Sequence, residues 1–439
     1  MLDNLFKLKE HNTNVRTEII AGITTFMTMA YIIFVNPNIL GEGGMDKGAV
    51  MVATCLASGL ITIAMGLYVN IPIALAPGMG LNAFYTYAVI LGMGVPWPVA
   101  LGAVFISGVV FIILTVTKIR ETIVDGIPLS LKKGITVGIG LFIALIGFQS
   151  AGIVAAHPAT LLTLGNLQEP GAIVALTGLI FTAVLLALRV NGAILIGILA
   201  STVVAMFMGV TKFPTGLGDL FSLPPSLAPT FLKLDILGAI QLGLINIILT
   251  FTFVELFDTL GTLVGTLGRA NLLDKEGKSP LLGKAMKVDA AGIPFGAMLG
   301  TSTVTAYIES GAGVAAGGRT GLTAVTTGIL FLLALFIAPL AGLVPAAATA
   351  PALIIVGLFM MASVRDINFD DFTEGLPAFL TIVMMPFTYS IAFGIAFGLL
   401  SYTAIKVLTG RYKEVHWIIY ILAGIFVLRE ILSLLGIHI

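Results

Sequence analysis

The sequence predicts an all-α polytopic membrane protein with fourteen transmembrane spans, built as two inverted repeats of seven spans. Three observations support this fold class: the composition, the distribution of basic residues, and two breaks at matching places in the two halves. Hydrophobic residues make up 58% of the 439 residues and charged residues only 10%, with a mean hydropathy of +1.09. A soluble domain carries about 25% charged residues, so we expect most of this chain to lie in a lipid bilayer.

Hydrophobic runs of roughly span length follow one another along the whole chain. The predicted spans cover residues 17–36, 49–69, 75–94, 98–117, 134–155, 172–188, 192–209, 239–267, 286–301, 303–314, 320–341, 346–363, 376–391 and 393–409. A further apolar stretch, 416–436, contains Arg429 and Glu430. Charges inside an apolar helix predict an interfacial helix here rather than a full span.

The basic residues predict the orientation, because cytoplasmic loops carry an excess of Lys and Arg. With the N-terminus in the cytoplasm, fourteen spans leave only Lys47, Lys212 and Lys233 in outer loops, out of 22 basic residues, with Arg429 unassigned. We therefore expect a multi-pass protein of the inner (plasma) membrane with both termini cytoplasmic. The formal net charge of zero gives no reason to expect nucleic-acid binding.

The two halves of the chain share short matches in the same order. The matches are Thr25-Phe26 with Thr250-Phe251, Ala64-Met65 with Ala297-Met298, and the double spans 172–209 with 376–409. This alignment sets Ala30 opposite Glu255. Because each half has an odd number of spans, the second half must insert upside down. Inverted repeats of this kind favour alternating access around a central site.

Two breaks interrupt the hydrophobic pattern, at residues 73–82 and 303–313, where Gly, Pro and small polar residues gather. A broken helix inside a bilayer must satisfy its freed N–H and C=O groups on protein, water or ligand. Broken segments at matching places in two halves indicate a transporter's substrate site. We expect broken spans 3 and 10 to meet at mid-membrane as short extended segments.

Three carboxylates are the candidate chemical groups. Glu255 lies near the middle of a long apolar span, where a charged carboxylate costs about 2.5–3.5 kcal/mol. Asp258, three residues further on, shares its helix face. Glu309 lies inside the second break, beside Ser310 and freed backbone N–H groups. Nearby carboxylates affect each other's protonation, so Glu255, Asp258 and Glu309 are predicted to couple a proton. The alternative for each is a structural role, at a helix interface or as a helix cap.

The residues around the breaks favour a flat, neutral ligand. Asn82 ends the first break, and its amide can both donate and accept hydrogen bonds. Phe84 follows it and Phe26 lies on the first span; either ring could stack on a heterocycle, although core packing is the commoner role. Acceptors without a Lys or Arg nearby in the sequence suit a planar ligand rich in N–H donors, or a cation.

The sequence predicts neither a metal site nor a cofactor. Its four His have no metal-ligand partner at useful spacing, and Cys55 is the only cysteine. No Gly-rich phosphate-binding loop ending in Gly-Lys-Ser/Thr occurs, so an ion gradient rather than nucleotide hydrolysis would drive transport.

Four stretches resemble the AzgA-type purine permeases of the nucleobase–ascorbate transporter group, and the likeness extends over nearly the whole chain. They are GITTFMTMAYIIFVNP (22–37), APGMGLNAF (76–84), FVELFDTLGTL (253–263) and GTSTVTAYIES (300–310). The resemblance implies proton-coupled uptake of adenine, guanine or hypoxanthine, with the proton preferred over Na⁺. Stretches 188–191 and 413–416 look more like the guanine/hypoxanthine members. Some relatives have Pro where Val304 stands and Asp where Glu255 stands, which leaves the choice among purines open.

The resemblance also implies a division into a core and a gate domain. The core would comprise residues 1–118 (spans 1–4) and 236–341 (spans 8–11). The gate would comprise residues 119–235 (spans 5–7) and 342–439 (spans 12–14 and the interfacial helix). The oligomeric state stays open, a homodimer included.

Family roles carry over to the residues that match the family motifs. Glu255 and Glu309 are then purine-binding carboxylates, and Asn82 is a polar residue needed at the site. Ala30 and Phe84 match positions beside the ligand. The neighbouring residues that complete the predicted binding set are Phe26, Ile308 and Ser310.

Two other classes of function compete with proton–purine symport. One is a passive nucleobase facilitator or an anion transporter on the same fold; the absence of a cation near the breaks disfavours anions. The other is an intramembrane Mg²⁺-dependent transferase that uses Glu255 and Asp258. Such an enzyme needs a second acidic cluster. The only one, residues 366–374, lies in a short inside loop.

Overall fold

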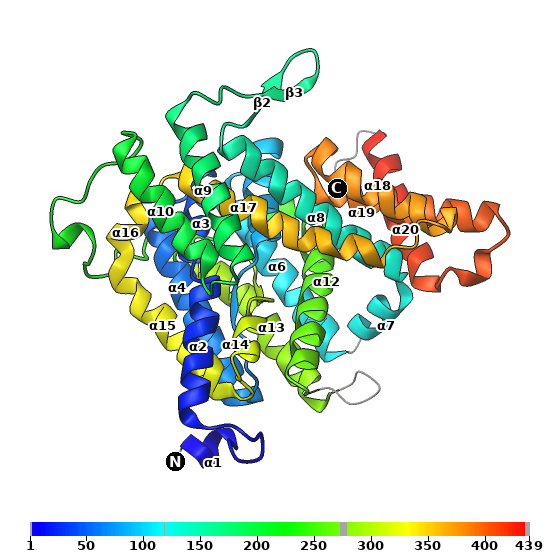
Figure 1. Ribbon diagram of the computed structural model, residues 1–439. Helices are drawn as coiled ribbons and strands as arrows, with labels where there is room; N and C mark the ends of the chain where they lie inside the picture. Colours follow the sequence, from blue (N-terminus) through cyan, green and yellow to red (C-terminus); the bar gives the residue numbers. More distant parts are fainter. Residues whose placement is uncertain (1, 118, 244, 273–278, 435–439) are drawn as a thin grey trace.

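The computed structural model describes residues 2–117, 119–243, 245–272 and 279–434 (Figure 1). Within these residues, a helix or a broken segment lies at each of the fourteen predicted places. The first half contains α1 (Leu2–Phe6), α2 (Val15–Met29), α3 (Ile32–Glu42), α4 (Lys47–Ala64), β1 (Leu75–Pro77), α5 (Met79–Ala83), α6 (Trp97–Val116), α7 (Ile119–Gly126), α8 (Leu129–Ser150), β2 (Val154–His157), β3 (Leu161–Leu164), α9 (Pro170–Ala187) and α10 (Ala193–Phe207).

The second half contains α11 (Ile236–Gln241), α12 (Ile245–Arg269), α13 (Pro280–Leu299), β4 (Val304–Ala306), α14 (Ser310–Ala315), α15 (Gly321–Leu333), α16 (Ala338–Leu343), α17 (Ala346–Met361), α18 (Phe372–Thr388), α19 (Ile391–Leu408) and α20 (Trp417–Leu434). In this half a short strand again lies between two helices, with β4 between α13 and α14 as β1 lies between α4 and α5. Wider π-helical turns extend α4 through Met65–Val69 and α5 through Phe84–Gly92. Residues 435 and 436 of the predicted interfacial helix lie outside the described residues.

The two breaks meet as predicted. Strand β1 pairs antiparallel with β4, with Leu75 opposite Ala306 and Pro77 opposite Val304. Side chains from the preceding helices serve the outer edges of this pair. Thr62 of α4 bonds both the N–H and the C=O of Leu75, at 2.9 and 3.1 Å. Asp289 of α13 accepts from the Ala306 N–H at 3.0 Å. The freed backbone groups at these positions are therefore satisfied inside the protein.

The first predicted span, 17–36, lies within one apolar candidate membrane span, Val15–Glu42. A turn at Ala30 and Tyr31 divides it into α2, which ends at Met29, and α3, which begins at Ile32. The Asn14 side chain caps α2 by accepting from the Thr17 N–H at 3.0 Å. Ala30 and Tyr31 keep right-handed helical backbone angles at this turn, and the Tyr31 side chain reaches Glu309, which follows β4.

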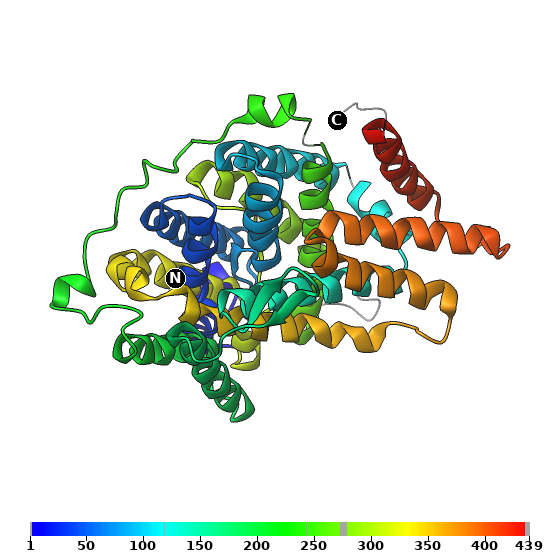
Figure 2. The same cartoon turned by 90° about the horizontal axis from the view of Figure 1, so that it is seen from above.

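The helices pack into two groups, seen in Figures 1 and 2. In one group α15 packs on α2 and α4, and α13 packs on α4 and α6. In the other, α8 packs on α17 and α18, α9 lies between α10 and α17, and α18 lies along α19. The division into two moving domains stays a prediction.

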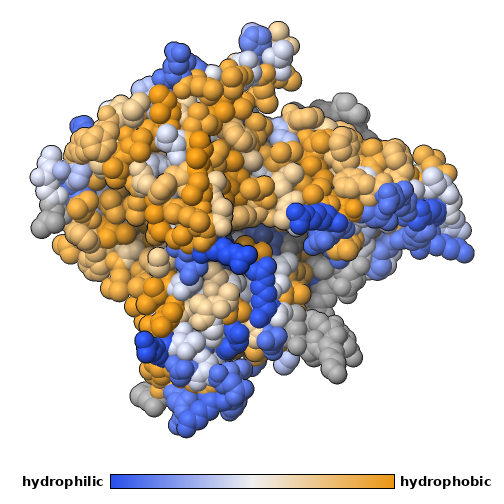
Figure 3. Space-filling model, in the orientation of Figure 1, coloured by the Kyte–Doolittle hydropathy of each residue, from blue (hydrophilic) through white to orange (hydrophobic). Residues whose placement is uncertain are grey.

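Nine helices in the described part are long and apolar enough to cross a membrane. Shorter apolar helices occupy three further predicted spans, 79–92, 193–207 and 372–388. The remaining two are α13, which carries Lys284, Lys287 and Asp289, and the β4–α14 segment. The class of multi-span helical membrane protein is confirmed, whereas the number of crossings stays a prediction. Apolar side chains cover most of the face shown in Figure 3, and hydrophilic ones gather at the end near the N-terminus.

Ion pairs occupy the acidic segment that the transferase hypothesis considered. Lys133 pairs with Asp366 at 2.8 Å, Lys406 with Glu374 at 3.0 Å, and Arg411 with Asp371 at 2.8 Å. Hydrogen bonds from Thr373 and then from Arg411 lower the pKa of the Asp371 carboxyl to about 2. These carboxylates are held by side chains of the protein itself, and they join the ends of α8, α18 and α19.

Two helices approach each other closely at Gly313. A Cβ built there would lie 2.0 Å from the Thr25 hydroxyl and 2.7 Å from the Ala21 carbonyl oxygen. We predict that Gly313→Ala lowers stability by about 1–3 kcal/mol, the usual cost of overpacking. Gly265→Ala is the matched control, because a Cβ on Gly265 meets no atom within 4 Å. Thermal unfolding in detergent measures both variants, and equal midpoints would contradict the predicted contact.

Candidate functional site

A cavity of about 420 Å³ opens beside the paired strands. Residues of β4, α5 and α12 form one wall and residues of α8 and α17 the other, so the cavity lies between the two helix groups. Its volume is within the usual range of small-molecule sites, about 300–1,000 Å³. The surface of the cavity is mostly apolar. Its polar lining residues are Tyr31, Lys132, Lys133, Thr136, Asp258, Thr262, Thr305, Tyr307, Glu309 and Ser363.

Two predicted carboxylates, Asp258 and Glu309, line this cavity. Glu309 follows β4 and stands immediately before α14, and the Tyr31 hydroxyl donates to its Oε1 at 2.7 Å. Asp258 comes from α12, is half-buried, and interacts electrostatically with Glu309. The neighbouring Tyr307 donates its hydroxyl hydrogen to the Pro77 carbonyl, which fixes the turn after β4 against β1.

Glu255 lies behind the cavity wall and not on it. Its side chain is 1% exposed, and it is not among the described residues that line the cavity. Its Oε1 lies 3.3 Å from the Thr259 hydroxyl, and its Oε2 has no hydrogen-bond partner among the described residues. Asp258 and Glu255 share a helix face, as predicted, but only Asp258 reaches the cavity. The binding role of Glu255 stays a prediction.

A fourth carboxylate, Asp289, was missed in the sequence. It is fully buried on α13 and accepts from the Thr259 hydroxyl at 2.8 Å and from the Ala306 N–H at 3.0 Å. The Thr259 hydroxyl also lies 3.1 Å from that of Thr305, which lines the cavity. Asp289 therefore connects β4 to the neighbourhood of Glu255. The available signal was an Asp inside predicted span 286–301, partly hidden by Lys287 two residues before it.

A positive charge lies closer to the carboxylates than predicted. The sequence has no Lys or Arg near Glu255, but the buried Arg120 of α7 interacts electrostatically with Glu255 and Asp289. Its guanidinium also lies 4.5 Å from the centre of the Phe111 ring. Lys132 and Lys133 line the cavity at the start of α8. The expectation of no fixed cation near the breaks is wrong, because helices distant in the sequence bring these charges in.

Asn82 and Ser310 hold the two breaks together. The Ser302 hydroxyl donates to Asn82 Oδ1, while no hydrogen-bond partner of Asn82 Nδ2 occurs in the described part of the chain. Ser310 accepts from the Ala74 N–H at 3.0 Å. Both side chains are fully buried and neither lines the cavity. The structure places them as links between the breaks, one layer behind the ligand space.

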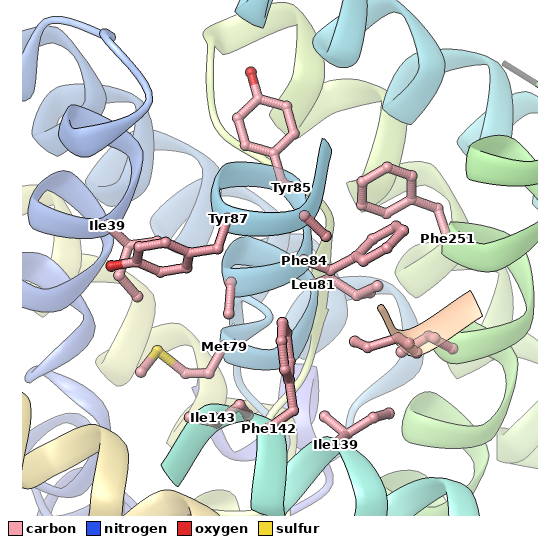
Figure 4. Packing of buried hydrophobic residues seen from close by; sticks show 14 of the residues in the cluster. Ile39, Met79, Leu81, Phe84, Tyr85, Tyr87, Ile139, Phe142, Ile143 and Phe251 are labelled. Atoms are coloured by element: carbon pink, nitrogen blue, oxygen red, sulfur yellow. The ribbon is translucent and has the colours of Figure 1, made fainter. Parts of the chain in front are cut away.

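Of the aromatic and apolar residues predicted at the site, Phe84, Phe26 and Ala30 pack inside the protein, and Ile308 lines the cavity. Phe84 is fully buried and packs edge-on against Phe251, with 5.2 Å between ring centres (Figure 4). Phe26 packs against Phe331 at 5.1 Å. Ala30 is buried at the α2–α3 break, whereas Ile308 is 55% exposed and lines the cavity. Both rings thus take part in core packing, and their contact with a ligand stays a prediction. Ile308 and Glu309 are among the residues of the second break that line the cavity.

No metal centre is evident in residues 2–117, 119–243, 245–272 and 279–434, where no group of three or more His, Cys, Asp or Glu side chains could hold an ion. The carboxylates that come together, Glu255, Asp258, Asp289 and Glu309, are distributed over the two sides of β4. Of the four, Asp258 and Glu309 offer acceptor oxygens to the cavity, whereas Glu255 and Asp289 are buried behind its lining.

Comparisons with known proteins agree with this geometry. A family model described as "Permease family" matches residues 16–397. A putative permease of Methanocaldococcus jannaschii is 57% identical over 98% of both chains. Adenine permease AdeQ of Escherichia coli is 47% identical, covering 98% of this chain and 96% of its own. Guanine/hypoxanthine permease PbuG of Bacillus subtilis is 47% identical, covering 97% and 99%.

Solved structures share the fold at low identity. The transmembrane domain of the cyanobacterial bicarbonate transporter BicA superposes with a TM-score of 0.65 at 15% identity, covering 88% of this chain and 97% of that one. Murine Slc26a9, an anion transporter in the inward-facing state, gives a TM-score of 0.62 at 11% identity, covering 90% and 68%. At these identities the likeness is one of architecture.

The Asp289 contact generates a prediction about β4. Asp289→Asn replaces one acceptor oxygen by an NH₂ group, so either Thr259 or the Ala306 N–H loses its partner. Leaving a buried donor unsatisfied costs about 1–3 kcal/mol, and amide hydrogen exchange at residues 304–306 should accelerate. Asp235→Asn, at the exposed cap of α11, is the control. Unchanged exchange at residues 304–306 in the Asp289 variant would show that the strand does not depend on this carboxylate.

Proposed function

The chain belongs to the permease family, and from that premise we propose that it carries a purine nucleobase across the membrane together with a proton. Guanine and hypoxanthine are the proposed substrates, with adenine as a further one. The relatives named as adenine and guanine/hypoxanthine permeases support this substrate class, since they match the chain over nearly its whole length. Membership of a permease family makes the protein a transporter and not an enzyme.

One observation carries the proposal: Asp258 and Glu309 line a single, mostly apolar cavity beside the paired strands. A purine presents N–H groups along its edge and flat apolar faces above and below. Carboxylates accept from such N–H groups, and hydrogen bonds to a charged acceptor are among the stronger ones. The apolar lining from Met79, Leu81 and Ile139 suits the faces of the ring. On this basis Asp258 and Glu309 contact the ligand directly.

We assign residues 1–118 and 236–341 to a core domain and residues 119–235 and 342–439 to a gate domain. The cavity lies where the two groups of helices face each other, with core residues from β4 and α12 and gate residues from α8 and α17. Alternating access then consists of movement of one group against the other around the ligand. With the N-terminus in the cytoplasm, Lys132 and Lys133 lie at the cytoplasmic end of α8.

Proton coupling follows from the number of carboxylates around a neutral ligand. Asp258 interacts electrostatically with both Glu309 and Asp289, and Glu255 with Asp258 and Asp289. Several like charges in a dry site are costly, and a shared proton lowers that cost. A proton that enters with the base therefore stabilises the loaded site. Glu255, which lies behind the wall, is assigned to this coupling step.

Anion transport is the competing function on this fold. The two solved structures of similar fold are described as a bicarbonate transporter and an anion transporter. Lys132 and Lys133 line the cavity, but Lys133 pairs with Asp366. Two carboxylates on the cavity wall would repel an anion, so the site favours a neutral donor-rich ligand.

Substitution of the wall carboxylates should weaken purine binding. Asp258→Asn and Glu309→Gln each remove a charged acceptor, and we expect affinity for hypoxanthine to fall by about 1.5–3 kcal/mol, the range for a charged hydrogen bond. Calorimetry on the detergent-solubilised protein measures this loss. Asp370→Asn, on an exposed loop outside the cavity lining, is the control.

Glu255→Gln separates the two roles of that residue. If Glu255 acts in coupling, affinity should stay within about threefold, below the effect of one hydrogen bond to a charged group. A loss equal to that of Asp258→Asn would instead place Glu255 in contact with the ligand. Wild-type affinity in both the Asp258 and the Glu309 variants would refute the proposed site.

Accumulation in proteoliposomes tests the coupling ion. With a proton gradient directed inward, labelled hypoxanthine should accumulate above equilibrium, and a protonophore should abolish accumulation while leaving exchange of internal for external purine intact. Accumulation that survives the protonophore but stops when Na⁺ is replaced would identify Na⁺ as the coupling ion. Equilibration without accumulation under either gradient would mean a passive facilitator, and uptake of bicarbonate or chloride instead would establish anion transport.

A further inference from the structure

Tyr31 stands at the interruption of the first span and faces the site. It follows α2, precedes α3, lines the cavity and is 1% exposed. Its hydroxyl donates to Glu309 Oε1 at 2.7 Å, across 278 residues of sequence. No sequence pattern singles out this hydroxyl, because the contact depends on how span 1 meets the second break.

The surrounding contacts hold Tyr31 and Glu309 in a fixed relation. The Thr28 hydroxyl lies 3.4 Å from the Glu309 carbonyl oxygen and bonds the Thr25 carbonyl of its own helix at 2.8 Å. At Gly313, α14 approaches α2 so closely that a Cβ would overlap the Thr25 hydroxyl. Span 1 and the turn after β4 therefore pack against each other. This packing holds the Tyr31 hydroxyl next to Glu309.

The hydrogen bond leaves the two Glu309 oxygens in different environments. Oε1 is occupied by a donor from the protein, while the side chain remains half-buried beside the cavity. A free carboxylate can rotate and offer either oxygen, but one anchored at Oε1 presents Oε2 in a defined direction. A fixed acceptor in an otherwise apolar site discriminates strongly against ligands that lack the matching N–H.

We propose that Tyr31 is a positioning residue that anchors the Glu309 carboxylate and so sets the site's preference for ligands with an N–H donor at that point. The inference rests on the proposed purine transport and adds a residue to it. Tyr31 acts through Glu309, so its contribution should disappear when the Glu309 carboxylate is absent.

A double-mutant cycle measures that dependence. Hypoxanthine affinity is determined for the wild type, Tyr31→Phe, Glu309→Ala and the double variant, because alanine, unlike glutamine, leaves no oxygen that could accept from Tyr31. We expect Tyr31→Phe to weaken binding about tenfold in the wild-type background and less than about twofold in the Glu309→Ala background. Equal losses in both backgrounds would overturn the proposal, since Tyr31 would then act independently of Glu309.

Tyr85→Phe is the matched control. Tyr85 is equally buried, lies in the broken third span, and donates its hydroxyl to the Trp97 carbonyl at 2.9 Å (Figure 4). It is not among the described residues that line the cavity. Its variant should keep wild-type affinity. A tenfold loss there would mean that any buried hydroxyl deletion disturbs the site, which would contradict a specific role for Tyr31.

Infrared difference spectroscopy of the ligand-free protein tests the contact independently of transport. The band of the Glu309 carboxyl group is assigned by its loss in Glu309→Gln, and it should shift in Tyr31→Phe but not in Tyr85→Phe. If Tyr31→Phe fails to fold, 3-fluorotyrosine at position 31 keeps the ring and strengthens the donor, so the band should still move. An unmoved band overturns the Tyr31 proposal, whereas absence of purine binding in the wild type with a shifted band overturns only the proposed function.

Discussion

The pairing of β1 with β4 is the contact on which the rest of the molecule depends. A helix broken inside a bilayer exposes backbone groups that cost several kcal/mol each if they stay unpaired. Here each break supplies partners to the other, and Thr62 and Asp289 serve the outer edges at Leu75 and Ala306. Both broken spans are interrupted where β1 and β4 pair. The cavity lies beside this pair, with Glu309 at its edge.

The same pairing joins structural and chemical roles in one network. Asp289 holds β4 through the Ala306 N–H and, through Thr259, reaches both Thr305 on the cavity wall and the buried Glu255. Arg120 brings a positive charge to these carboxylates from the linker helix α7. A change in the protonation of Glu255 or Asp289 would therefore affect both β4, which lines the cavity, and α7, the helix between α6 and α8.

The sequence predicted the breaks and their pairing, because these depend on local composition and on matches between the halves. It also singled out Glu309, which lines the cavity and whose role stays a prediction. It did not separate Asp258 from Glu255. The two are three residues apart on one face, and only the rotation of α12 against β4 decides which reaches the cavity. Phe84 and Phe26 each pack edge-on against another ring, Phe251 and Phe331, and their stacking on a ligand stays a prediction. The sequence offered Tyr31 only as an aromatic ring on the first span. The contact of its hydroxyl with Glu309 and the approach of Arg120 to the carboxylates were missed, because no match between the two halves indicates them.

The pairing also constrains the order in which the protein can be made. Pro77 and Tyr307, which seal the strands together, are 230 residues apart. At a synthesis rate of about 5–20 residues per second, β1 waits roughly 10–50 s for its partner strand to be translated. During that interval a broken span with unsatisfied backbone groups cannot rest in hydrocarbon. The first half must therefore be held at the insertion machinery, or stay in a looser arrangement with water at the break, until the second half arrives to complete it.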